Sequence, residues 1–242
     1  MRAGVGPTVA VLQSNYLPWK GYFDIIADVD LFIFYDDVQF TKNDWRNRNL
    51  VKTRSGTSWI TVPVGPAIHR RICDVTIPDG RWAKAHWKTL SQSYARAQHF
   101  AHYREFFESV YLGRTWKFLS ELNQHLITAI ARDFLGVAAR FEDSRSYALE
   151  GQASERLLTL LQSAGARTYV SGPSARGYLD ETAFRRAGIE VAYKSYEGYP
   201  QYPQLHPPFD HRVSIVDMLF NLGPQTPHYI WGWRAGQGAA IP

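Results

Sequence analysis

The chain opens with a strand, a polar loop, a helix and a second strand, and this order limits the folds it can adopt. The apolar run 9–12 predicts a buried strand, and the loop after it carries Pro18 and leads into an apolar helix of about two turns. The apolar run 31–35 predicts a second strand, which ends in the paired carboxylates Asp36 and Asp37. Together these elements form a βαβ unit, the building block of α/β sheets.

The rest of the chain returns to the same alternation after a helical middle. Apolar spacing predicts further strands at 58–64, 72–77, 167–171 and 189–193, and helices at 82–94, 103–112, 115–135, 154–164, 180–187 and 213–222. From Gly223 onward Pro, Gly and Trp dominate, so we expect an extended tail with a disordered end. We therefore predict an α/β fold with a Rossmann-like, mainly parallel sheet and a helical layer or insert in the middle of the chain.

The length of 242 residues suits one substantial core. We expect a single domain over 1–242, made of an opening α/β part at 8–79, a helical insert at 80–136, a closing α/β part at 137–223 and a tail at 224–242. No apolar run approaches the roughly 20 residues that span a bilayer. The first residues also lack the apolar segment of a secretory signal. We therefore expect a cytoplasmic protein without a membrane span.

The net charge of +5 is dispersed, with no run of five or more Lys or Arg. Dispersed charge is typical of a solvated surface, and the next alternative is a site for an anionic small molecule rather than for nucleic acid. The lone Cys73 excludes an internal disulfide and a cysteine-based zinc site, and the histidines show no zinc spacing. We expect no metal centre built by the protein, and the composition leaves the oligomeric state open.

Polar residues follow the first strand, at the edge where open α/β sheets bind ligands. A polar turn before a helix start also forms a ready anion site, so we expect a nucleotide or phosphate there. The candidate ligand-binding residues on this turn and helix start are Gln13, Asn15, Tyr16, Trp19, Lys20 and Tyr22. Pro18 in the first helical turn is equally explained as ordinary helix structure.

Asp36 and Asp37 are the first candidates for catalysis. A carboxylate there suits a Mg²⁺ ion held with substrate phosphates, a ribose hydroxyl, or general-base chemistry. Adjacent strand residues face opposite ways, so one of the two is expected to enter the pocket; the alternative is a turn that ends the strand. His86, on a helix with Trp82 and Trp87, is a reserve base, although a partly buried structural histidine is the commoner situation.

The segment 42–49 is the richest polar cluster of the chain, and a second polar turn follows the strand at 167–171. In the first, Arg46 and Arg48 could clamp the diphosphate of a nucleotide-sugar; the alternative is a solvated loop with Trp45 in the core. In the second, backbone amides and hydroxyls could hold phosphate or carboxylate, or the turn is merely structural. The candidate binding residues of these two segments are Lys42, Asp44, Trp45, Arg46, Asn47, Arg48, Ser171, Gly172 and Ser174.

Several long motifs in fixed order resemble the WbqC-like family. They are the segments 13–24, 35–40, 42–49, 59–64, 84–90, 169–175 and 214–220, so the resemblance covers about residues 8 to 223. It implies a bacterial protein of O-antigen or other lipopolysaccharide biosynthesis, in a family proposed to transfer glycine to sugars. Other members carry His-Gln-Pro where this chain has Gln13, Ser14 and Asn15, so no role of that histidine is carried over.

A more distant likeness concerns nucleotidyltransferases and adenylate-forming ligases with a His-x-Gly-His signature. Trp19 to Tyr22 stand in its place, without the histidines, so the likeness is one of layout and not of chemistry.

These observations lead to one expected function and two alternatives. We expect a transferase that attaches glycine or another acyl group to a nucleotide-linked amino sugar, an anionic small molecule. If glycine has to be activated, ATP and Mg²⁺ are the candidate cofactors. The first alternative is a non-catalytic nucleotide-sugar binding protein of the polysaccharide machinery. The second is an RNA-binding module, which requires a continuous basic face and salt-dependent binding.

Overall fold

A parallel sheet forms the centre of the molecule in the computed structural model, which describes residues 6–67, 69–78, 80–149 and 153–237. Its strands are β1 (Thr8–Leu12), β2 (Leu31–Phe34), β5 (Arg140–Asp143), β6 (Thr168–Ser171) and β7 (Glu190–Tyr193). They lie in the order β5-β2-β1-β6-β7, and every neighbouring pair is parallel. The predicted α/β, Rossmann-like sheet is confirmed.

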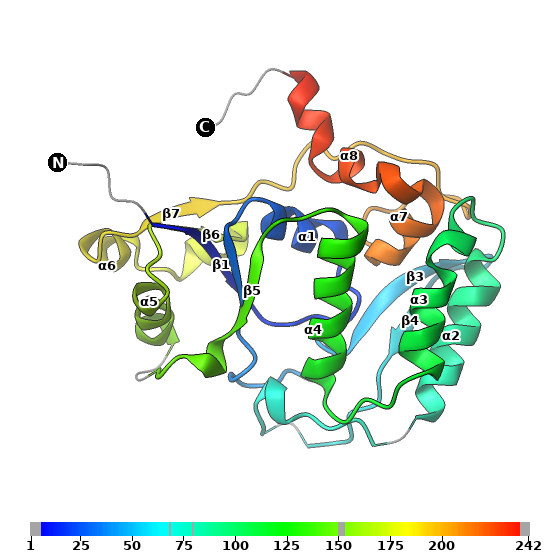
Figure 1. The fold of residues 1–242 in the computed structure, drawn as a ribbon, viewed down its shortest axis with the longest axis horizontal. Coiled ribbons are helices and arrows are strands. Elements are labelled where there is room, and N and C mark those ends of the chain that lie inside the picture. The colour runs from blue at the N-terminus through cyan, green and yellow to red at the C-terminus, as the bar shows by residue number, and fades with distance from the viewer. Residues whose placement is uncertain (1–5, 68, 79, 150–152, 238–242) are drawn as a thin grey trace.

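Side chains alternate between the two faces of this sheet, and each face has its own hydrophobic core. The flanking helices are α1 (Lys20–Ala27), α5 (Ala153–Ser163) and α6 (Glu181–Arg186). Val11 and Ile33 share a core with Phe184 of α6, whereas Ala10 and Phe32 belong to a larger core that includes α1. Figure 1 shows α5 and α6 on one side of the strands and α1 on the other.

The middle of the chain is helical, as the sequence predicts. Its helices are α2 (Arg81–Tyr94), α3 (Phe100–Leu112) and α4 (Leu119–Ala129), which a π-helical turn continues to Phe134. Gly136 then reverses the chain with a φ of 67°, a conformation that favours glycine. Farther along, α7 (Ile215–Leu222) packs against α3. The larger core of the molecule lies among these helices and one face of the sheet.

Two strand predictions need correction. The run 72–77 is not a strand: it holds a 3₁₀ turn over Ile72–Asp74 and one isolated bridge from Thr76 to Phe118. Conversely, the supposed polar loop 42–49 runs into an unpredicted strand, β3 (Arg48–Thr53), which pairs antiparallel with β4 (Gly56–Thr61). Burial alternates over 73–77 as it would in a strand, but between residues 72 and 77 the structure gives this run only the single bridge from Thr76 and no neighbouring strand to pair with.

The segment after α7 is helical rather than extended, so the expectation of an extended tail is wrong for residues 224–237. It holds α8 (Thr226–Ile230) and a 3₁₀ segment over Gly232–Gln237. Residues 238–242, where we expected the disordered end, lie outside the described residues. Among the described residues, none of the helices combines the length and apolar character that a membrane crossing requires.

Candidate functional site

A cavity of about 630 Å³ opens at the carboxyl ends of β1 and β6. The chain passes from β1 outward to β2 and β5 on one side, and places β6 and β7 on the other. The strand order therefore reverses between β1 and β6, and open α/β sheets bind their ligands at such a point. The fold alone makes this cavity the first candidate for a binding site.

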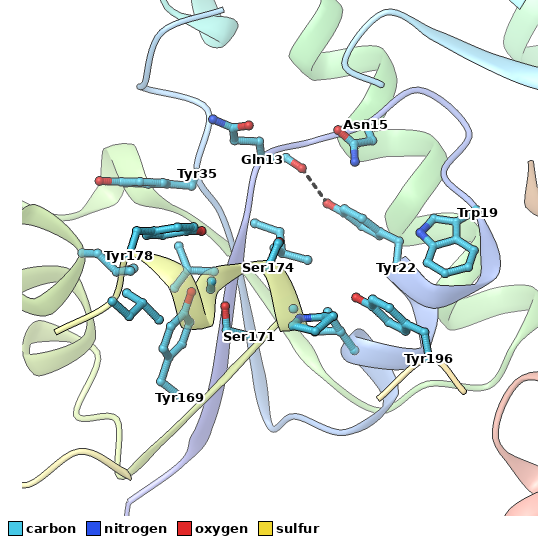
Figure 2. A pocket seen from close by; sticks show the side chains of 18 of the residues that line it. Gln13, Asn15, Trp19, Tyr22, Tyr35, Tyr169, Ser171, Ser174, Tyr178 and Tyr196 are labelled. Carbon is cyan, nitrogen blue, oxygen red and sulfur yellow. Dashed lines mark hydrogen bonds between the residues drawn. The ribbon is translucent and has the colours of Figure 1, made fainter. Parts of the chain in front are cut away.

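Aromatic side chains form both ends of this cavity, which we call the switch-point cavity. Figure 2 shows them in two groups, with Tyr35, Tyr169 and Tyr178 at one end and Trp19, Tyr22 and Tyr196 at the other. Gln13, Ser171 and Ser174 lie between the groups. Aromatic faces next to amide and hydroxyl groups suit ring-shaped polar ligands such as bases and sugars.

Arg46 is the only charged side chain among the described residues that line the switch-point cavity. Its Nη1 pairs with Asp44 at 2.6 Å, while its Nε is buried without a partner. Asn15, also in the lining, has a buried Oδ1 without a partner. Buried polar atoms are normally hydrogen-bonded, so these two side chains retain unused capacity for a polar ligand.

Two segments far apart in sequence are held together beside the cavity. The backbone N–H of Tyr16 donates to the carbonyl of Trp45 at 2.9 Å. The buried amide of Asn49 donates to the carbonyls of Tyr16 and Leu17, at 3.1 and 2.8 Å. Leu17 has a φ of 45°, which costs of order 1 kcal/mol or more in a residue other than glycine. Asn49 therefore stabilises a strained turn that leads from β1 to Trp19.

Asp36 and Asp37 do not belong to the cavity lining. Asp36 is fully buried and accepts hydrogen bonds from the backbone N–H of Ser14 and from Gln124, both at 2.8 Å. Burial raises the pKa of the Asp36 carboxyl. Asp37 accepts from Ser144 at 2.6 Å and pairs with Arg156. Asp36 thus holds Ser14 between Gln13 and Asn15, the two lining residues of that turn. The catalytic role of Asp36 and Asp37 stays a prediction.

His86 lies in a buried hydrogen-bond chain within the helical layer. Its Nε2 donates to the carbonyl of Thr61 at 3.2 Å, so its Nδ1 accepts from the hydroxyl of Tyr16 at 2.8 Å. The Tyr16 hydroxyl in turn accepts from Tyr111 at 2.5 Å. Burial lowers the pKa of the His86 imidazole to about 4. Neither His86 nor Tyr16 lines the cavity, so the structure places them in the core.

The buried imidazole of His86 predicts that the folded protein loses stability in acid. The unfolded chain protonates His86 below about pH 6.5, whereas the folded chain resists protonation down to about pH 4. Its contribution to stability is complete above pH 6.5 and is lost as the pH falls, at about 1.4 kcal/mol per pH unit. Urea unfolding is expected to show that His86 contributes about 2 kcal/mol less to the free energy of unfolding at pH 5 than at pH 7. The His86→Gln variant is expected to lack this part of the pH dependence. Equal losses in both proteins would contradict the buried neutral imidazole.

The other sequence candidates fall into three places. Lining the switch-point cavity are Gln13, Asn15, Trp19, Tyr22, Arg46, Ser171, Gly172 and Ser174. Lining a second cavity are Asp44, Trp45 and Arg48, together again with Asn15 and Trp19. Three candidates line neither cavity. Lys42 is exposed, and Asn47 is buried and donates to the carbonyl of Val62 at 2.9 Å. Lys20 is also buried, and its Nζ lies 2.6 Å from Nδ1 of His211.

Four tyrosines of the lining were not among the sequence candidates: Tyr35, Tyr169, Tyr178 and Tyr196. Tyr35 follows β2, Tyr169 lies within β6, Tyr196 follows β7 and Tyr178 follows Ser174, so that these residues meet is evident only once the strand order is known. Tyr35 could have been predicted from the sequence as a site residue, because it directly precedes the Asp36–Asp37 pair at a strand end.

The donor set of the cavity bears on the candidate cofactors. Among the lining residues that the structure describes, none is a carboxylate, an imidazole or a thiol. Over the described ranges, no group of three or more His, Cys, Asp or Glu side chains is placed to hold a metal ion. Mg²⁺ in nucleotide sites is held by one or two carboxylates besides the phosphates. The switch-point cavity therefore does not fit a Mg²⁺–ATP complex held by its own side chains.

Comparisons with known proteins relate the chain to one protein family and to one similar protein. The model of the WbqC-like protein family matches residues 13–229. The chain is 48% identical over 224 residues to the "Uncharacterized protein Rv1507c" of Mycobacterium tuberculosis, covering 92% of this chain and 96% of that protein. No solved structure matches the chain significantly.

Proposed function

Since the chain belongs to the WbqC-like protein family, we propose that it acts in surface polysaccharide biosynthesis, as a transferase that attaches glycine or another acyl group to a nucleotide-linked amino sugar. The nucleotide-sugar occupies the switch-point cavity. The acyl donor approaches from the side of Asn15 and Trp19. The substrate class, the transferred group and the role of each residue named below are parts of this proposal.

The observation that carries the proposal is the layout of the cavity, which has an aromatic group at each end and Arg46 as the one charged side chain of its described lining. A nucleotide-sugar has the same layout, because its base and its sugar ring are joined by a diphosphate. Stacking on the tyrosines holds the base and the sugar. The guanidinium of Arg46 faces the diphosphate, which it can bind with two parallel hydrogen bonds.

Catalysis in such a cavity rests on positioning. The sugar amine attacks the carbonyl carbon of the acyl donor, an amide bond forms, and the leaving group departs with the electron pair of its bond. The amine proton passes to solvent. Gln13, Asn15 and Ser174 orient the amine through hydrogen bonds, and holding two reactants in attack geometry is itself a large part of catalysis. We assign no step to Mg²⁺.

One observation favours the alternative of a non-catalytic nucleotide-sugar binding protein. The described lining of the switch-point cavity contains no carboxylate, imidazole, thiol or lysine amine, so tyrosine hydroxyls are its only side chains that commonly serve as general acids or bases. Both functions require the same bound ligand, so product formation separates them.

The proposal predicts that a dTDP-linked amino sugar binds and that Arg46→Met weakens the binding about 10- to 100-fold, as the loss of a charge-assisted hydrogen bond does. Isothermal titration calorimetry measures both affinities. Arg48→Met is the matched control, because Arg48 lines only the second cavity. Equal losses in the two variants, or no binding to the wild-type protein, would contradict the assignment of the cavity.

Mass spectrometry then tests the reaction. The protein is incubated with the dTDP-linked amino sugar and preformed glycyl-adenylate, and a glycyl adduct of the sugar, in excess of that formed without protein, is the expected product. Binding of the sugar without such an excess of adduct would favour the non-catalytic alternative.

A further inference from the structure

A second cavity of about 660 Å³ lies beside the first and carries two exposed tryptophans. Trp45 is 42% exposed and Trp59 is 45% exposed. Large apolar rings left open to solvent next to a cavity indicate a binding surface. The two cavities share Asn15 and Trp19, so ligands bound in both would meet at these residues.

The two indoles form an aromatic platform, which is defined by Trp45 and Trp59. Their ring centroids lie 5.5 Å apart with the planes tilted by 40°. The guanidinium of Arg48 lies over the Trp59 ring, 4.3 Å from its centroid. Aromatic side chains stack on planar bases, and such stacking tolerates different bases.

The charges around the platform favour an anion. Asp44 is neutralised by its ion pair with Arg46 at 2.6 Å, and Arg212 pairs with Asp210 at 3.1 Å. Arg48 has no ion pair with any described carboxylate, and its Nε is buried without a hydrogen-bond partner. The cavity therefore offers one guanidinium without an ion pair among the described residues, stacked on one face of Trp59, beside the exposed parts of two indoles. A base and a phosphate require such a combination of aromatic surface and charged donor.

We propose that the second cavity is the donor subsite, and that it binds a purine mononucleotide carrying the acyl group, an acyl-adenylate. This inference rests on the proposed function, which requires an activated donor next to the sugar amine. The purine stacks on the platform and the phosphate binds Arg48. In the transfer, the bond from the amine nitrogen to the acyl carbon forms, the bond from that carbon to the phosphate oxygen breaks, AMP leaves with the electron pair, and the amine proton goes to solvent.

AMP is the probe for this subsite, measured by NMR titration and by tryptophan fluorescence. Trp59→Ala is expected to weaken AMP binding about tenfold or more, as the loss of one stacking surface does. Ribose 5-phosphate, which lacks the base, is expected to bind weaker than AMP by a similar factor. Arg48→Met is expected to weaken AMP but not adenosine. Trp59 is half exposed on β4, so its removal leaves the core intact.

Tyr178→Ala is the matched control, because it removes an exposed aromatic residue of the switch-point cavity only. It is expected to leave AMP affinity unchanged, while Trp59→Ala leaves dTDP-amino-sugar affinity unchanged. AMP binding that survives Trp59→Ala would overturn the inference, as would equal affinity for ribose 5-phosphate. A wild-type dimer that Trp59→Ala dissociates would also overturn it, because the platform would then be covered by a second copy. AMP binding at the platform without nucleotide-sugar binding elsewhere would support the subsite and refute the proposed function.

Discussion

Replacing Asp24 by asparagine is expected to lower the free energy of unfolding by about 3–5 kcal/mol, the usual effect of breaking a buried ion pair. Asp24 is fully buried in α1. Its carboxylate pairs with Lys194 at 2.8 Å and with Arg234 at 2.6 Å, and it accepts from the Tyr199 hydroxyl at 2.5 Å. Asparagine leaves Arg234 without its carboxylate partner and leaves Lys194 paired only with Asp28, at 2.5 Å. Urea unfolding monitored by circular dichroism measures the change.

Glu108→Gln is the control for this prediction. Glu108 pairs with Arg104 on the surface of α3 at 3.3 Å, and both side chains are exposed. Exposed pairs of this kind contribute about 0–1 kcal/mol. If Asp24→Asn were no more destabilising than Glu108→Gln, the buried cluster would not hold the C-terminal segment against α1.

Adding a single methyl group at Gly21 is expected to weaken nucleotide-sugar binding at least about 100-fold, or about 2.8 kcal/mol. A Cβ at this position would lie 2.3 Å from Cζ2 of Trp19, so the indole has to move. Trp19 lines both cavities and packs edge-on against Tyr196 at 5.0 Å, so both ligand sites change shape. Overpacking also costs about 1–3 kcal/mol of stability.

Gly172→Ala is the matched control, since Gly172 lines the same cavity. Its added Cβ would lie 3.5 Å from the Tyr196 hydroxyl, an ordinary contact, and its φ of −71° suits alanine. We expect calorimetry to give a near wild-type affinity for Gly172→Ala and a large loss for Gly21→Ala. Similar affinities in the two variants would show that the position of the Trp19 ring does not matter for binding.

The opening βαβ unit was predictable from sequence because every residue of β2 and nearly all of α1 are buried. β2 therefore appears as a continuous apolar run, and α1 is apolar from Tyr22 to Ala27 except for Asp24. β3 was hidden because its buried residues include polar ones. Asn49 satisfies its amide against backbone carbonyls inside the protein, and Lys52 is also buried. Polarity in the sequence therefore indicated a loop where tertiary hydrogen bonds stabilise a strand.

The candidate site was predictable only in the parts that follow single strands. Gln13 and Asn15 come after β1, and Ser171 ends β6, so the rule about strand ends points to them without further knowledge. The grouping of Tyr35 with Tyr178 depends on strand order, which no local pattern encodes. The separation of Arg46 from Arg48 depends on where β3 starts, because Arg46 lies in the turn before that strand and Arg48 is its first residue. Whether these residues bind a ligand stays a prediction.

The contact between Arg234 and Asp24 has a consequence for the gene as well as for the protein. A stop codon or frameshift shortly before codon 234 would leave the parallel sheet and α1 to α7 encoded. It would nevertheless delete one of the two cations that neutralise a carboxylate in the first helix, the helix whose N-cap is Trp19. Truncations at this point should therefore behave like core mutations.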